Sequence, residues 1–174
     1  MIIYEIKQRL KEDLYNNLKT GNSNSWDDPV DNIQIHYAGI ESVTSDKAIV
    51  IDAVQVGPEE FEIAGRQGPT LNEYLVSIAI RVTSGDVEYG EQTLAKIMRR
   101  IWRTIYTSDL RGPDGSPQQQ TITNLSVVAD GISERVTHAY IQSAQEDAGE
   151  LPQGMMAYVG VIVVRVRTQI QEIS

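Results

Sequence analysis

The chain has 174 residues, of which 41% are hydrophobic and 22% charged, a composition typical of a soluble globular domain. It contains no cysteine, which excludes disulfide bridges, thiolate zinc sites and cysteine nucleophiles, and no apolar run approaches the roughly 18 residues of a membrane helix. The formal net charge of −9 is the opposite of the basic surplus that proteins binding duplex DNA normally carry.

The amino-terminal segment has the pattern of an amphipathic helix. Apolar residues recur at helical spacing from Ile3 to Leu18, and Gly21 follows them as a typical C-terminal stop. A helix is therefore predicted over residues 2–19. The elements expected next are a polar loop over 22–32, strands over 33–40 and 47–56, and a loop rich in glycine and proline over 57–69.

The segment 71–106 combines a long strand with a helix. Apolar and polar residues alternate up to Thr83, which predicts a half-buried strand, and Ser84-Gly85-Asp86 forms the turn that follows. In the helix after this turn, one face is apolar and is expected to pack on the sheet. That face consists of Leu94, Ile97, Met98, Ile101 and Ile105.

A second face of the same helix is basic and carries Lys96, Arg99, Arg100 and Arg103. This stripe is interpreted either as a solvated face that the helix dipole favours or as a patch that meets an acidic surface on a neighbouring subunit. A nucleic-acid site is less consistent with four basic residues on an acidic chain. Trp102 and Tyr106 widen the apolar arc beside the stripe and are read as core residues or as interface anchors, with the core favoured for Trp102.

The carboxyl-terminal part is predicted to contain more strands and two more long loops. Strands are expected over 122–129, 136–145 and from 155 to about 168, with a turn at Asp130-Gly131 and loops over 109–120 and 145–154. Loops of this length in a small domain indicate contacts with partners. The candidate loop-contact residues are Trp26, Asp27, Asp28, Arg111, Asp114, Glu146, Asp147 and Glu150.

The order helix, strands, helix, strands predicts one α+β domain over residues 1–174. We expect a mostly antiparallel sheet of about six strands, with two main helices packed on one face. No residue pattern indicates catalytic or cofactor chemistry. His36 and His138 are read as ordinary strand histidines, and the aspartates from Asp27 to Asp31 lack the spacing of a calcium loop. The chain is therefore expected not to be an enzyme and to bind neither metal nor cofactor.

The order of the elements resembles that of the tail terminator, or tail completion, proteins of tailed bacteriophages. The match lies in the strand, turn and helix over 75–83, 84–88 and 91–106, followed by strands around 125–129, 139–145 and 158–166. The resemblance implies a ring of six copies at the head-proximal end of the tail tube. Such a ring stops further addition of tube protein and forms the joint to the neck or connector.

The same resemblance implies partners and a location. The partners would be other copies of the chain, the tail tube protein, neck or connector proteins and the tail sheath. The protein would be made in the host cytoplasm and would reside in the virion at the tail–head junction. DNA would pass through the lumen without specific binding, which fits the net charge of −9, although solubility explains that charge equally well.

Two alternatives remain open. The first is another neck, connector or head-completion protein, which would also be acidic and form rings. The second is a small soluble enzyme or ligand-binding α+β domain that acts as a dimer.

Overall fold

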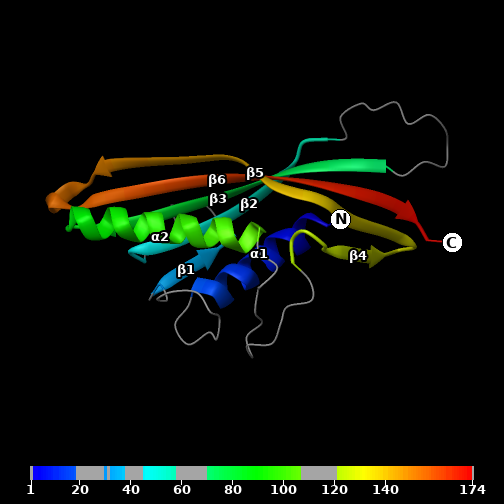
Figure 1. The fold of residues 1–174 in the computed structure, drawn as a ribbon, viewed down its shortest axis with the longest axis horizontal. Coiled ribbons are helices and arrows are strands. Elements are labelled where there is room, and N and C mark those ends of the chain that lie inside the picture. Colours follow the sequence, from blue (N-terminus) through cyan, green and yellow to red (C-terminus); the bar gives the residue numbers. More distant parts are fainter. Residues whose placement is uncertain are drawn as a thin grey trace.

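A sheet lies across one side of two helices in the computed structural model (Figure 1). The structure describes residues 2–18, 30, 32–37, 45–57, 70–106 and 121–173. The loop-contact candidates Trp26, Asp27, Asp28, Arg111 and Asp114 lie outside the described residues.

The described helices and strands follow one another in the predicted order. They are α1 (Ile3–Leu18), β1 (Ile33–His36), β2 (Lys47–Gln55), β3 (Thr70–Ser84), α2 (Val87–Tyr106), β4 (Ser126–Ala129), β5 (Ile132–Glu150), a short 3-10 turn (Pro152–Gly154) and β6 (Met156–Glu172). The six strands have the order β1-β2-β3-β6-β5-β4. β1 runs parallel to β2 and the other neighbouring pairs are antiparallel, so the sheet is mixed and the predicted α+β class is confirmed.

Both helices pack on the same face of the sheet, as expected. Alternate residues of β3 from Tyr74 to Val82 face them, and the matching residues of β6 from Tyr158 to Val166 do the same. These side chains and the apolar faces of both helices form one buried cluster. The period of two in the strands and the helical spacing of the apolar residues therefore placed the core correctly.

Two glycines let α2 approach the sheet closely. A Cβ atom on Gly90 of α2 would lie 2.2 Å from Cε2 of Tyr158, and one on Gly160 of β6 would lie 2.5 Å from Sδ of Met98. The helix begins at a capped turn, because the backbone N–H of Tyr89 donates to Oδ1 of Asp86 at 3.0 Å. The cap and the glycine contacts fix both the start and the height of α2 above β6.

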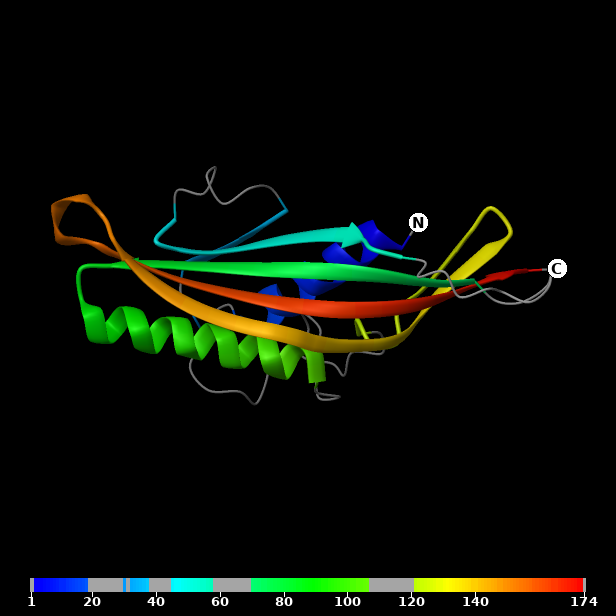
Figure 2. The ribbon, with the colours of Figure 1, turned by 90° about the horizontal axis from the view of Figure 1, so that it is seen from above.

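The predicted loop over 145–154 is wrong. β5 continues to Glu150, and its residues from Gln145 to Glu150 pair one by one with β6 from Val161 back to Met156. Only the tip of this hairpin turns, where the N–H of Leu151 donates to the carbonyl of Met155 at 2.8 Å. The hairpin extends to the end of the molecule at which α2 begins (Figure 2).

The strand before β5 is shorter than the predicted strand over 122–129. β4 begins at Ser126, whereas Thr121 and Asn124 close a turn in which the N–H of Thr121 donates to Oδ1 of Asn124 at 2.7 Å. The predicted turn at Asp130-Gly131 is confirmed. Both residues have positive φ, 52° and 76°, which Gly131 adopts without strain.

Candidate interaction surface

The face of the sheet opposite the helices carries apolar residues interspersed with the polar residues Asp52, Ser77 and Arg81, and no described element covers it (Figure 1). Its apolar residues near the centre are Ala48, Val50, Leu75, Ala79, Val159, Val161 and Val163. Ala48 and Val50 are buried, and the others in this set are half-buried. Antiparallel sheets with a solvated face normally place polar residues on it, so a cluster of apolar residues on the second face is typical of a surface that a partner covers.

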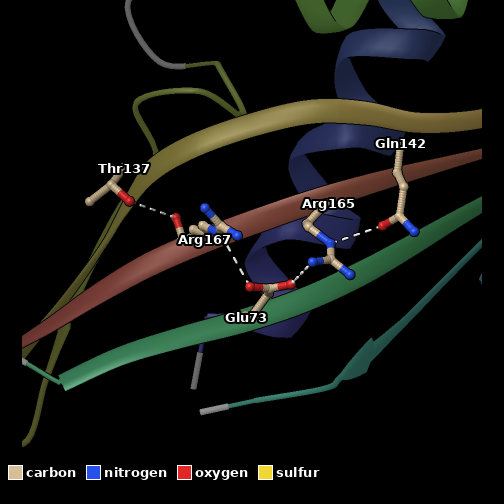
Figure 3. A network of polar contacts seen from close by, with 5 residues as sticks. All are labelled: Glu73, Thr137, Gln142, Arg165 and Arg167. Atoms are coloured by element: carbon tan, nitrogen blue, oxygen red, sulfur yellow. Dashed lines mark hydrogen bonds and ion pairs between the residues drawn. The ribbon is translucent and has the colours of Figure 1, made fainter. Parts of the chain in front are cut away.

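An ion cluster joins three strands at one end of this open face (Figure 3). Glu73 of β3 lies between two arginines of β6: its Oε1 is 2.6 Å from Nη1 of Arg165, and its Oε2 is 3.2 Å from Nε of Arg167. Arg165 also donates from Nε to Oε1 of Gln142 on β5 at 2.9 Å. The Glu73 side chain is only 10% exposed and that of Arg165 24%, so this ion pair is partly shielded from solvent, whereas Arg167 is 49% exposed.

β5 contains two bulges, and both bulged residues face β6. The register of β5 on β6 shifts between Val136 and His138 and again between Ile141 and Ser143, so Thr137 and Gln142 are the extra residues. The Thr137 hydroxyl donates to the carbonyl of Arg167 at 3.2 Å, and Gln142 accepts from Arg165 (Figure 3). The bulges thus supply the side chains that hold β5 to the ion cluster.

Two hollows lie on the open face. One, of about 380 Å³, adjoins the ion cluster and is lined by Leu71, Asn72, Glu73, Thr137, His138, Arg167 and Gln169. The other, of about 540 Å³, lies along the β5–β6 hairpin. Its apolar lining comes from Ala148, Leu151, Ala157, Val159 and Val161, and its acidic lining from Glu146, Asp147 and Glu150. We call the second hollow the hairpin groove.

The three acidic loop-contact candidates therefore lie on a strand. Glu146, Asp147 and Glu150 are all exposed on β5. Asp147 also accepts a hydrogen bond from the backbone N–H of Ala148 at 2.8 Å. Asp147 pairs with Val159 and lies on the floor side of the hairpin groove, whereas Glu146 and Glu150 pair with Gly160 and Met156 and project from the opposite side of the hairpin.

The outer edge of β5 is free over most of its length in the described part of the chain. β4 pairs only with residues 132–135, and the N–H of Val136 donates to the carbonyl of Leu125. Farther along, the N–H of Ile141 donates to the Tyr106 hydroxyl at 2.7 Å, which caps one edge amide with a side chain from α2. Bulges, side-chain caps and acidic residues are devices that prevent one edge strand from pairing with another.

Removal of the Tyr106 hydroxyl is expected to make the outer edge of β5 more prone to pair with strands of other molecules. In Tyr106→Phe the ring remains, but the N–H of Ile141 loses its acceptor, which costs about 1 kcal/mol of stability and exposes a strand donor. We expect faster exchange of the Ile141 amide with deuterium and more irreversible aggregation on heating. Tyr4→Phe, at an exposed tyrosine of α1, is the matched control, and equal behaviour of the two variants would contradict the capping role.

The basic stripe of α2 is divided by the fold. Arg99 and Arg103 are exposed and Lys96 is half-buried, whereas Arg100 is only 3% exposed. Nη1 of Arg100 donates to the carbonyl of Asn17 at 3.0 Å, near the end of α1, where helix carbonyls lack partners. The prediction that Arg100 belongs to a surface patch is therefore wrong, because it joins α2 to α1.

Trp102 and Tyr106 lie at the surface. Each is 49% exposed, and their ring centroids are 5.4 Å apart. The favoured placement of Trp102 in the core is therefore wrong, since the core-facing arc of α2 is already filled by its isoleucines and Met98. Arg99, Trp102, Arg103 and Tyr106 form one exposed face of aromatic and basic residues, which we call the α2 face.

A buried carboxylate that the sequence analysis did not single out connects α1 to the sheet. Glu134 of β5 is fully buried and accepts hydrogen bonds from the hydroxyls of Tyr74 and Thr168, each at 2.7 Å. It also accepts from Nδ2 of Asn72 at 3.4 Å and from the N–H of Ile2 at 3.2 Å, just before α1. One signal in the sequence could have indicated its burial. Glu134 lies two residues before Val136, so the alternation of side chains along β5 places both on the core-facing side.

The environment of Glu134 fixes its charge. Burial acts to raise the pKa of Glu134, but the hydrogen bonds from Tyr74, Thr168, Asn72 and Ile2 outweigh burial and hold the pKa below its ordinary value. Burial, the hydrogen bond to Glu134 and its negative charge raise the pKa of Tyr74. Glu134 is thus an ionised structural carboxylate at the amino-terminal end of a helix.

The described residues contain no group of three or more histidine, aspartate or glutamate side chains arranged to hold a metal ion. His138 is exposed on β5. His36 lies on β1, and its Nε2 is 3.2 Å from Oε1 of Gln34. In the same described ranges, no helix is long and apolar enough to cross a membrane.

Comparison with known proteins assigns no family. No family model matches the chain, and no curated protein matches it. Among solved structures, a chain from the virion of a native gene transfer agent (GTA) particle aligns over 78% of both chains, with 10% sequence identity and a TM-score of 0.34. A TM-score this low neither defines a shared fold nor assigns a function.

Proposed function

We propose that this protein is a structural, non-enzymatic component of a phage-type virion that forms a ring at the head-proximal end of a tail tube. The observation that carries the proposal is the cluster of apolar residues on the open face of the sheet, which no described element covers although the chain carries a net charge of −9. A surface of this kind in an otherwise acidic protein is typical of a subunit that functions in an assembly.

The order of the elements supports the tail terminator role. α1, the strand pair of β1 and β2, the β3–turn–α2 unit and the long strands β5 and β6 follow one another as in the sequence resemblance. The capped and bulged outer edge of β5 also supports the role, because a protein that ends polymerisation needs one side that cannot accept another subunit. In this role the ring contacts the tail tube protein, the neck or connector proteins and the sheath.

Two surfaces of different chemistry on one chain are compatible with head-to-tail contacts between copies. The hairpin groove is acidic, and the α2 face is basic and aromatic, so neither surface is complementary to itself. Contacts between unlike surfaces are head-to-tail, and they close into a ring when the rotation between neighbours allows it. We propose six copies, with DNA passing through the lumen without specific binding.

The test measures mass and shape together. The purified protein is examined by light scattering and negative-stain imaging, alone and with tubes of tail tube protein. We expect rings of about six subunits or particles at one end of the tubes, and shorter tubes when the protein is present during polymerisation. A stable monomer or dimer that ignores tubes would overturn the proposal and favour a ligand-binding domain.

A further inference from the structure

Hydrogen-bond donors without acceptors surround the hollow of about 380 Å³ beside the ion cluster. Arg167 binds Glu73 through Nε at 3.2 Å, and its two Nη atoms bond to no described residue (Figure 3). In the described part of the chain, the ring of His138 and the side-chain amide of Gln169 also lack partners, and both residues line the hollow. The hollow therefore offers several donors to a group from another molecule.

The register of the strands places a further guanidinium group beside the hollow. Arg135 of β5 lies opposite Gln169 of β6, and Gln169 lies opposite Leu71 of β3. The next row across the sheet consists of His138, Arg167 and Glu73. Residues opposite one another in antiparallel strands share a face, so both rows lie on the open face. Arg135 is exposed and forms no hydrogen bond or ion pair with any residue that the structure describes.

This end of the open face is positively charged, whereas the chain as a whole has a net charge of −9. Three neighbouring rows contain the guanidinium groups of Arg135, Arg167 and Arg165 and one carboxylate, that of Glu73, which leaves two positive charges unbalanced. Free donors and unbalanced positive charge beside a hollow are suited to an anionic group. A guanidinium group binds a carboxylate or a phosphate with the same two-pronged geometry, so the charge identifies an anion but not its source.

The apolar residues around the hollow favour a carboxylate on a protein over a phosphate. Leu71 lines the hollow and is 49% exposed. Beyond the ion cluster, the open face continues through Leu75 and Val163 to Val161. A partner that covers apolar residues and also supplies an anion is a protein segment with both acidic and apolar side chains. The backbone of a nucleic acid supplies the anion but leaves these apolar residues exposed to solvent.

We propose that this hollow binds an acidic side chain of a partner protein, with Arg167 and Arg135 donating to the carboxylate and Leu71 contacting its aliphatic part. His138 and Gln169 are the further donors at the same site. The partner is a virion protein that covers the open face. Only this identification of the partner rests on the proposed function, because the anion site itself is argued from the geometry of the chain.

Binding of a small acidic peptide tests the site. The probe is N-acetyl-leucyl-glutamyl amide, and its control is the glutaminyl peptide, which has the same shape but no carboxylate. NMR of isotope-labelled protein follows the Nε–H signal of Arg167 and the side-chain amide signals of Gln169. We expect the acidic peptide to shift these signals and to bind about tenfold more tightly than the control. Inorganic phosphate and a single-stranded DNA of about 12 nucleotides are measured in the same way.

Neutral variants show which side chains hold the carboxylate. Arg135→Gln and Arg167→Gln are each expected to lower the affinity for the acidic peptide about tenfold. Arg99→Gln removes the same charge from an exposed position on α2, on the other side of the sheet, and should leave the affinity unchanged. Because Arg135 does not take part in the ion cluster, Arg135→Gln tests the site without disturbing Glu73. Thermal unfolding shows that each variant folds.

The outcomes separate the anion site from the proposed ring. Equal affinity for the two peptides, or an unchanged affinity in both arginine variants, would refute the anion site and leave the ring unaffected. Tighter binding of phosphate or DNA than of the acidic peptide would refute the assignment of a protein partner. Binding of the acidic peptide by a chain that neither forms rings nor caps tubes would support the site and overturn the proposed function.

Discussion

Replacing Glu134 by alanine is expected to lower the free energy of unfolding by about 3–5 kcal/mol. The carboxylate is fully buried and accepts hydrogen bonds from Tyr74, Thr168, Asn72 and the N–H of Ile2. Alanine would leave these donors without that acceptor and would leave a cavity where α1 meets the sheet. Glu134→Gln fills the same volume but turns an amide toward the donors, so we expect a loss of about 1–3 kcal/mol.

The same residue makes stability depend on pH. The folded-state pKa of Glu134 lies below its unfolded value of 4.5, so its contribution is complete above that value and is lost as the pH falls through the folded-state pKa. Tyr74 acts at the other extreme, because its folded-state pKa is raised above 10.0. Its contribution is complete below pH 10 and is lost as the pH rises beyond that value.

Urea unfolding of Glu134→Ala, Glu134→Gln and the unmodified chain at pH 7 and at pH 3 measures both effects. The difference between the unmodified chain and Glu134→Gln should shrink at the acidic pH, because the unfolded chain then binds a proton at Glu134 and the lowered pKa of the folded state opposes that binding. Glu172→Ala, at an exposed position of β6, is the control and should change stability little at either pH. A loss below about 0.5 kcal/mol in Glu134→Ala would refute the structural role.

Gly90→Ala is expected to destabilise the protein by about 1–3 kcal/mol, although alanine is the better helix former. The new Cβ would lie 2.2 Å from Cε2 of Tyr158 and within 2.9 Å of two further ring atoms. The ring is buried in the core cluster and has no free space to retreat into, so α2 would be forced away from β6. Helix propensity alone predicts the opposite sign, a gain of about 1 kcal/mol.

Thermal unfolding of three variants shows whether Gly90→Ala lowers or raises the stability of the protein. Gly90→Ala should lower the melting temperature, and the added change Tyr158→Leu, which removes the ring, should recover part of the loss. Gly149→Ala is the control, because a Cβ at that position meets nothing within 4 Å. A higher melting temperature in Gly90→Ala would show that the helix does not lie as close to β6 as described.

The elements whose patterns depend only on nearby residues could be predicted from the sequence. The apolar spacing of α1, the alternation in β3 and the turn at Asp130-Gly131 all follow from local chemistry, and the structure confirms them. β5 shows the limit of such reasoning. Its acidic residues after Gln145 indicate a loop when read locally, but each of them lies opposite a residue of β6 in the sheet. Pairing with a distant strand outweighs local polarity.

The predictions for Arg100 and Trp102 on α2 were wrong for the same reason, because contacts with distant parts of the chain determine where these side chains lie. Arg100 is spaced like its basic neighbours, and only the carbonyl of Asn17, 83 residues earlier, distinguishes it from them. The exposure of Trp102 depends on how wide an arc of the helix the sheet can cover, which the helix sequence does not contain. The Glu134 cluster combines residues from distant segments and so forms no motif along the chain, and the hairpin groove depends on the pairing of β5 with β6, which the local pattern did not indicate.

The position of β6 in the sheet has a consequence for how the subunit is made. It is the last described strand in chain order, yet it lies between β3 and β5, and it pairs with β3 across separations of about 70 to 100 residues. During translation, β1 to β5 are synthesised before β6, which lies between β3 and β5. The sheet can therefore form completely only after β6 has been added. Completion of the groove and of the open face is thereby tied to completion of the fold, so a half-synthesised subunit lacks both of these surfaces.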